Sequence, residues 1–161
     1  MTIPIELTTG LVIDYRAREW CKLPYPDHSH GCPNYDHKVT CPPKVCLVED
    51  FVDLDQILWL VVEPFGLADH ISRMRTKHPD WSDRQLKCVL YWQGGVNSRL
   101  GKGCQELASE VGGIYTICPE AMGVQVIKTV KRTGIPIKPR PNGWVFKVGL
   151  VGFRKESSWK K

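Results

Sequence analysis

The sequence predicts an α/β fold: a single compact domain in which helices flank a small central sheet, with an irregular, cysteine-rich loop near the N-terminus. Apolar runs typical of buried strands alternate along the chain with segments of helical spacing. The chain has 161 residues, enough for one domain with its own core and too few for two ordinary domains. Residues 21–46 are so rich in proline, histidine and cysteine that no regular element is expected there.

The first half of the chain is expected to form two strands and a helix. Residues 11–15 (LVIDY) have the composition of a short strand, and the apolar run at residues 56–63, bounded by Pro64, predicts a buried central strand. Residues 67–77 are expected to form a helix. The His-Pro pair at residues 78–79 ends it, because a residue before proline disfavours helical geometry.

A longer helical region follows. Ser82 and Gln85 have the spacing of a capping box, which starts a helix. Apolar residues then recur at helical spacing as far as Val111, with an interruption at the Gly-Gly pair of residues 94–95. This pattern predicts two helices, or one helix broken at the glycines. A second Gly-Gly pair at residues 112–113 is expected to end the region.

The last third of the chain is expected to hold two strands separated by a helix. Residues 114–117 and 144–153 have the composition of strands. The intervening helix is expected to run from Cys118 to about Arg132. The Pro-Glu pair after Cys118 supports this start, since proline suits the first helical turn and glutamate suits the positive end of the helix dipole.

We interpret residues 1–161 as one domain with a loop at residues 21–46, an α/β core at 47–153 and a basic tail at 154–161. Apolar residues make up 42% of the chain and charged residues 24%, which is a globular composition. No apolar run approaches the length of a membrane helix, and the N-terminus lacks the pattern of a signal peptide. These observations predict no membrane association, a cytoplasmic location and reduced thiols.

The net charge is +5, and many of the basic residues lie in the last third of the chain. A basic surface attracts nucleic acid, nucleotides or an acidic partner protein. No aromatic–basic binding motif accompanies the charge, so a solvated basic surface is the favoured interpretation and a nucleic-acid partner is weakly supported.

The loop at residues 21–46 holds four of the seven cysteines and three of the five histidines. Thiolates are soft ligands that suit zinc, copper(I) and iron–sulfur clusters. Cys21, Cys32 and Cys41 are separated by ten and eight residues, which is wider than the close pairs of most zinc sites. Two of these cysteines precede proline, as a ligand of ferredoxin-type clusters also does. We therefore expect a metal-binding loop, with a 4Fe–4S cluster favoured and zinc as the alternative.

Cys118 is the candidate for a fourth position, because it lies where a strand gives way to a helix, a usual place for ligands in α/β sheets. A helix N-terminus stabilises a thiolate and attracts an anionic group. Cys118 is therefore either the fourth cluster ligand or a reactive thiol that faces the cluster, with Glu120 beside it. An ordinary helix start with an uninvolved cysteine is the remaining interpretation.

The other cysteines are expected to be packing residues. Cys46, Cys88 and Cys104 have apolar neighbours in the sequence and fit the role of small hydrophobic side chains. The three loop histidines have several possible roles, as a metal ligand, a proton donor, a substrate contact or simply a solvated side chain. They are His28, His30 and His37.

Two motifs in combination resemble those of a prokaryotic family called "predicted metal-binding protein" (domain of unknown function 2284). They are C-P-N-Y-D-H-K-V-T-C-P-P at residues 32–43 and C-P-E-A-M-G at residues 118–123, and the resemblance extends from about Cys21 to Gly152. Many relatives carry a further ferredoxin-like cysteine run before the second motif, which this chain lacks. The resemblance therefore implies one metal site, with the family's cysteine positions occupied by Cys21, Cys32, Cys41 and Cys118.

The favoured function is an enzyme with one 4Fe–4S cluster, acting as a sulfur transferase, lyase or reductase on a small molecule or nucleobase, or on a nucleotide. If only Cys21, Cys32 and Cys41 bind iron, one iron stays open and can act as a Lewis acid. Cys118 and Glu120 are then the candidate catalytic residues. Two alternatives are an electron carrier with four cysteine ligands and a zinc-stabilised module that binds nucleic acid or a protein.

Several established enzyme classes have no signature in this sequence. It contains neither a phosphate-binding loop nor a dinucleotide fingerprint, and it lacks the C-x3-C-x2-C run expected of radical S-adenosylmethionine enzymes. No recognisable spacing of serine, histidine and aspartate indicates a hydrolase. The sequence therefore predicts the kind of site more closely than it predicts the substrate.

Overall fold

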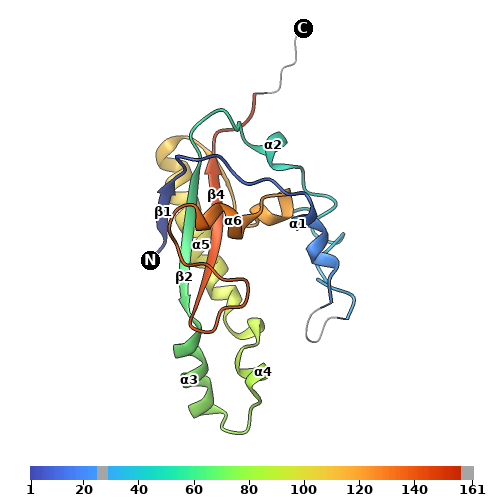
Figure 1. Ribbon diagram of the computed structural model, residues 1–161, viewed down its shortest axis with the longest axis vertical. Helices are drawn as coiled ribbons and strands as arrows, with labels where there is room; N and C mark the ends of the chain where they lie inside the picture. Colours follow the sequence, from blue (N-terminus) through green and yellow to red (C-terminus); the bar gives the residue numbers. More distant parts are fainter. Residues whose placement is uncertain (25–28, 157–161) are drawn as a thin grey trace.

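A four-stranded sheet organises the chain in the computed structural model, which describes residues 1–24 and 29–156 (Figure 1). Each neighbouring pair of strands is antiparallel, and the strand order is β1-β2-β4-β3. β3 pairs only with the last part of β4, from Leu150 to Gly152. The strands are β1 (Ile3–Glu6), β2 (Trp59–Gly66), β3 (Ile114–Thr116) and β4 (Trp144–Gly152).

Helices and single helical turns connect the strands. The longest is α5 (Gln93–Val111), and the segment before β2 holds only short pieces. The α-helices are α1 (Arg16–Glu19), α2 (Val48–Phe51), α3 (Leu67–Lys77), α4 (Asp83–Leu86), α5 and α6 (Val126–Lys131). The 3-10 turns are η1 (Trp20–Lys22), η2 (Val89–Tyr91) and η3 (Pro119–Met122). Within the described residues, no helix is long and apolar enough to cross a membrane.

The two faces of the sheet are covered differently. α5 packs on one face, where Val61 and Val151 of the sheet contact Leu100 and Cys104 of the helix. The opposite face forms the larger apolar cluster with α2, η3, α6 and the loops around them. The buried members of this cluster are Val48, Val52, Leu58, Leu60, Val62, Met122, Val124, Val130, Ile137, Val148 and Leu150. The predicted fold class is confirmed: this is a single compact α/β domain with helices on both sides of a small sheet.

β2 continues past the proline that is expected to end it. Pro64 lies inside the strand and is paired with Phe146 of β4. β1 covers β2 only from Trp59 to Val62, so Pro64 has a strand partner on one side alone. A strand tolerates proline in that situation, because the missing N–H removes no bond on the open side.

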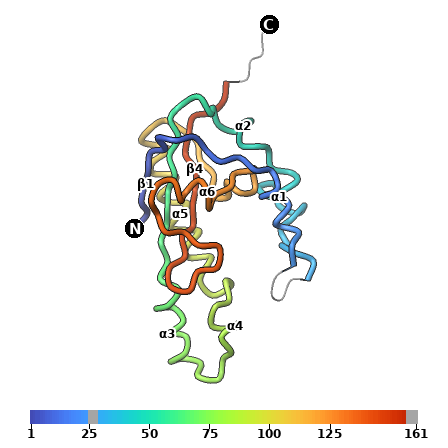
Figure 2. Tube along the Cα trace, in the orientation of Figure 1, coloured from blue at the N-terminus to red at the C-terminus, as the bar shows by residue number. Residues whose placement is uncertain are grey.

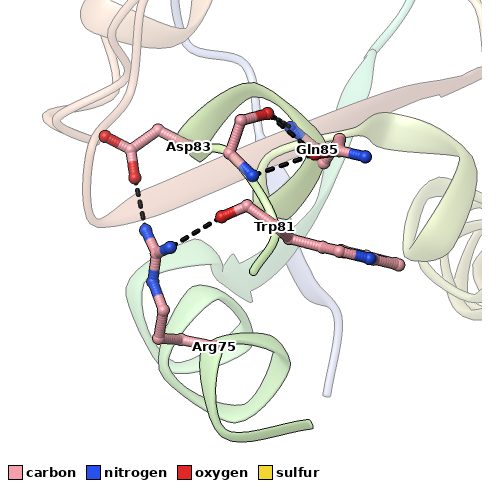
Figure 3. Close-up of polar contacts among 5 residues, drawn as sticks. Arg75, Trp81, Asp83 and Gln85 are labelled. Atoms are coloured by element: carbon pink, nitrogen blue, oxygen red, sulfur yellow. Dashed lines mark hydrogen bonds and ion pairs between the residues drawn. The ribbon is translucent and has the colours of Figure 1, made fainter. Parts of the chain in front are cut away.

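α3 and α4 form an arm that extends beyond the end of the sheet (Figures 1 and 2). α3 has the predicted bounds, and the predicted capping box is present where Ser82 and Gln85 bond to each other's backbone N–H (Figure 3). Arg75 of α3 donates to the carbonyl oxygen of Trp81 at 2.7 Å and forms an ion pair with Asp83. These contacts hold the two helices of the arm together.

The break in the long helical region lies before the glycines. α4 and η2 are short separate pieces, and α5 starts at Gln93, so that Gly94 and Gly95 fall in its first turn. Glycine is tolerated there more easily than in a helix interior. α5 ends as predicted, with Gly112 in the left-handed conformation at φ 72°.

The structure differs from the sequence-based expectations at three further places. The strand expected at residues 11–15 is wrong, since only Ile13 forms an isolated bridge, with Val124. The helix expected from Cys118 to Arg132 is two pieces, η3 and α6, because Gly123 at φ 96° ends the first. β1 was not expected: it is short and contains Pro4, which an edge strand accommodates.

Candidate metal centre

Two cysteine-bearing segments are held together at the edge of the large apolar cluster. Ile13 and Val124 form an antiparallel bridge, the Asp14 N–H donates to the Gly123 carbonyl at 2.8 Å, and the Gln125 N–H donates to the Val12 carbonyl at 2.7 Å. The first segment leads through α1 directly to Cys21 in η1, and the second follows directly after Cys118 and η3. This pairing brings together two thiols that lie far apart in the sequence.

A second contact places Cys32 beside Cys21. The Cys32 N–H donates to the Cys21 carbonyl at 2.7 Å. The residue before Cys32 is Gly31, which is buried and adopts φ +84°. A Cβ atom at Gly31 would lie 2.4 Å from the Cys21 carbonyl oxygen, so this approach of the two segments requires glycine.

The third part of the loop is held by Arg18 of α1. Its guanidinium donates to the carbonyl oxygens of Pro43 at 3.2 Å and Val45 at 2.8 Å, just beyond Cys41. Within the loop, the Asp36 N–H donates to the Pro42 carbonyl at 2.8 Å. The loop is therefore irregular, as predicted, but well connected by hydrogen bonds. Sequence patterns carried no signal for Arg18, because its partners are backbone carbonyls far along the chain.

The four predicted ligand cysteines are electrostatic neighbours. Burial raises the pKa of the Cys21 thiol, and the nearby Cys32 and Cys41 raise it further. Cys41 and Cys21 also act on the pKa of Cys118. All four thiols are half-buried. The structure thus brings together side chains from three separate parts of the sequence: η1, the loop and the start of η3.

This cluster of thiols is open rather than tightly convergent. In the described part of the chain, no three histidine, cysteine, aspartate or glutamate side chains converge closely enough to hold a single metal ion. An electrostatic interaction extends well beyond the length of a metal–sulfur bond, so neighbouring thiols need not share one coordination sphere.

The Cys118 thiol differs from its expected state. Burial raises its pKa to about 11, with a further increase from Glu120 that Lys147 partly opposes. The expectation of a thiolate stabilised by a helix N-terminus is therefore not met. The physical reason is that η3 is a single 3-10 turn ending at Gly123, which supplies little dipole, while the apolar surroundings disfavour the charged form.

The remaining thiols lie in three different environments. Cys104 is fully buried under β4 and burial raises its pKa to about 12, so the prediction that it packs in the core is confirmed. Cys88 is half-buried. Cys46 is exposed, which contradicts the expectation of a packing role, whereas its neighbours Val45 and Leu47 are partly buried.

A cavity of about 270 Å³ lies near the thiols, although none of the four candidate cysteines lines it. Trp20, the neighbour of Cys21, lines it, and so does Glu120, which acts on the pKa of both Cys21 and Cys118. Its other walls come from α6, β4 and the segment between them, and they are Val126, Ile127, Ile137, Lys138, Pro139, Pro141, Val145, Phe146, Lys147 and Val148. Glu120 was a candidate from the sequence; Trp20 and Lys147 were not, although Trp20 directly precedes a candidate ligand.

Two of the loop histidines line a different hollow. His30 and His37 are exposed and line a hollow of about 370 Å³ that Cys32 also lines. His28 lies outside the described residues. The roles suggested for these histidines stay predictions.

Comparisons with protein-family models, with curated proteins and with solved structures found no match to this chain. The resemblance to the "predicted metal-binding protein" family therefore stays a prediction that rests on the two sequence motifs. The candidate site is defined by its own geometry: four neighbouring thiols with a mainly apolar cavity beside them.

Proposed function

We propose that this protein is an iron–sulfur enzyme, with a 4Fe–4S cluster held by Cys21, Cys32 and Cys41 and with Cys118 as a thiol that faces the open fourth iron. Sulfur transfer, desulfuration or redox chemistry on a small molecule or nucleobase is the proposed activity. The observation that carries the proposal is the backbone pairing that brings the segments of Cys21, Cys32 and Cys118 together from distant parts of the sequence. Electrostatic interactions of Cys41 with Cys21 and Cys118 accompany it.

The donor set fits such a cluster. Iron–sulfur clusters are held by cysteine thiolates, and four cysteines are the usual complement. Hydrogen bonds also tie the segments around these thiols to one another, through the Cys32–Cys21 bond and the two bonds from Arg18, so cluster binding would have to draw together thiols whose backbones already lie close. Binding would release protons, because burial raises the pKa of both Cys21 and Cys118 and thiols ligate as thiolates.

An enzyme is favoured over an electron carrier by the cavity next to the thiols. When bound, the cluster supplies electron transfer or, at an iron without a protein ligand, Lewis-acid chemistry. The chain's own residues have the remaining roles. Trp20 and the apolar wall would displace water from a bound substrate. Glu120 lines the cavity and also acts on the pKa of Cys21 and Cys118, so its carboxylate would orient a substrate N–H or O–H group near the thiols.

Metal analysis of single-cysteine variants tests the proposal. The full chain is purified anaerobically, and iron, acid-labile sulfide and zinc are measured together with the absorption spectrum. Alanine substitution of Cys21, Cys32 or Cys41 is expected to remove most of the iron and the colour. Cys46→Ala is the matched control, since Cys46 belongs to the same loop but is exposed, and it should retain full iron content.

The outcome for Cys118→Ala separates a catalyst from a carrier. Retention of the cluster would indicate a three-cysteine site with an open iron, as the enzyme hypothesis expects. Loss of the cluster would indicate a closed four-cysteine site and would favour the electron carrier. A colourless protein that holds one zinc per chain would refute both and support the zinc-stabilised binding module.

A further inference from the structure

The cavity beside the thiols has a composition that restricts its ligand. Most of its wall is apolar, from the aliphatic residues of α6 and β4 and from two prolines. Three charged side chains interrupt this wall: Glu120, Lys138 and Lys147. A mainly apolar wall with a few placed polar groups is the usual composition of a small-molecule site.

The charges of the wall do not neutralise one another within the described chain. Neither Lys138 nor Lys147 forms an ion pair with a carboxylate among residues 1–24 and 29–156, and Glu120 has no lysine or arginine ion-pair partner there. Two lysines against one glutamate leave one positive charge in excess. Lys147 is half-buried and lies opposite Glu63 in the β2–β4 register, but Glu63 pairs with Arg99 and the N-terminal amine, so Lys147 has lost part of its hydration without an ion pair of its own. An anionic ligand would supply that compensation.

The position of Lys138 indicates where the anion would lie. Lys138 is exposed and lines both this cavity and an adjoining hollow that also includes Arg140. It therefore stands at the mouth, while Ile127, Ile137 and Val148 line the interior. A ligand would enter with its apolar body inward and its anionic group near the lysines.

The volume sets the size of the ligand. A cavity of about 270 Å³ is smaller than the pockets that enclose drug-sized molecules, about 300–1,000 Å³. It has room for one ring or a fused pair of rings, and too little for a dinucleotide. β4 forms one wall along residues 145–148, where it has no strand on that side within the described chain, so its backbone adds hydrogen-bonding groups.

We propose that the cavity lined by Trp20, Glu120, Lys138 and Lys147 binds a compact, largely apolar carboxylate, with one or two rings, as the substrate presented to the metal centre. The identification as a substrate rests on the proposed function. Binding itself depends on the cavity alone. Glu120 would accept a hydrogen bond from an N–H or O–H group of the ligand, and the lysines would bind its carboxylate.

Binding of three simple probes tests the inference. Dissociation constants of benzoate, benzamide and acetate are measured by calorimetry with the full chain, and amide shifts locate the site by NMR. Benzoate is expected to bind with saturable shifts at residues 145–148. Benzamide lacks the charge and acetate lacks the ring, and each should bind about tenfold more weakly or worse.

Two lysine variants and a control complete the test. Lys138→Met and Lys147→Met keep the aliphatic stem and remove the charge, and at least one should weaken benzoate about tenfold. Lys131→Met is the control, because Lys131 is an exposed lysine of neighbouring α6 that does not line the cavity. It should leave benzoate binding unchanged.

Each other result contradicts the inference. Absence of saturable benzoate shifts at residues 145–148, equal affinity for benzamide, or equal weakening by Lys131→Met would each overturn it. Iron and sulfide content of the same samples reports on the proposed function separately. Benzoate binding by protein that holds no iron would support the cavity inference and refute the proposed cluster. A loaded cluster in protein that does not bind benzoate would support the proposed cluster and refute the cavity inference.

Discussion

Replacing Gly31 with alanine should damage the metal centre without touching any thiol. Gly31 directly precedes Cys32, whose N–H donates to the Cys21 carbonyl, so Gly31 lies where the segments of these two candidate ligands meet. An alanine Cβ at this position would lie 2.4 Å from that carbonyl oxygen and 2.8 Å from the Cα atom of Lys22. Both neighbours are backbone atoms, which cannot rotate away as a flexible side chain would.

The expected loss of stability has two sources. An alanine at φ +84° is strained by about 1–2 kcal/mol relative to glycine. Part of this loss is offset because alanine lowers the conformational entropy of the unfolded chain. Relief of the clash must separate the two segments, which weakens the Cys32–Cys21 hydrogen bond, worth about 1 kcal/mol, and disturbs the packing around it. Together these effects lower the free energy of unfolding by about 3 kcal/mol.

Gly134 provides a matched control. It has the same φ of +84°, but a Cβ atom there would meet nothing within 4 Å. Gly134→Ala should therefore show the backbone strain alone, about 1 kcal/mol. Urea unfolding followed by tryptophan fluorescence under anaerobic conditions measures both variants, and metal content per chain is determined on the same samples.

The two variants must differ if the reasoning is right. Gly31→Ala should lose clearly more stability than Gly134→Ala, and only Gly31→Ala should lose metal. Equal losses of stability in the two variants would show that the close approach of the Cys21 and Cys32 segments has no energetic consequence. Unchanged metal content in Gly31→Ala would show that this approach does not shape the site.

Three further changes have defined outcomes. Arg99→Ala should lower the free energy of unfolding by about 2 kcal/mol in urea melts, because it leaves the buried Glu63 carboxylate with only the more distant N-terminal amine, and Arg99→Lys should restore part of it. Cys104 should resist iodoacetamide in the folded protein at pH 8 while the exposed Cys46 is alkylated, as peptide mass spectrometry would show. Burial raises the pKa of Cys104 to about 12 from an unfolded value near 9. The contribution of the Cys104 thiol to stability is therefore present below about pH 9 and is lost as the pH rises through the folded value. Cys104→Ala should reduce the fall in the free energy of unfolding over this alkaline range. Ser82→Ala should destabilise the arm by about 1 kcal/mol by removing its cap, measured by hydrogen exchange of the α4 amides.

Sequence patterns predict those parts of the fold that depend on contacts between residues close together in the chain. The bounds of α3 and the capping box at Ser82 follow from side chains within a few residues of each other. Residues 11–15 were misassigned because their backbone bonds to residues more than a hundred positions away, around Gly123. Apolar composition alone does not distinguish such a docked segment from a strand.

The same division applies to the candidate site. The spacing and proline neighbours of the cysteines indicated Cys21, Cys32, Cys41 and Cys118 from the sequence alone. The residues that position them could not be predicted, since Arg18 and Gly31 act on backbone carbonyls, which leave no side-chain pattern. The cavity was equally hidden, because its walls come from η1, η3, α6 and β4, and only the tertiary fold brings these together.

The uncovered edge of β4 also bears on how the protein avoids self-association. An open strand edge is a template on which another chain can add a strand. The segment that lies beside this edge across the cavity contains Pro136, Pro139 and Pro141, which have no N–H to donate and cannot extend a ladder. The edge itself carries the charge of Lys147, which disfavours a second strand. This part of β4 can therefore line a ligand cavity without offering its open edge as a template for a strand of another chain.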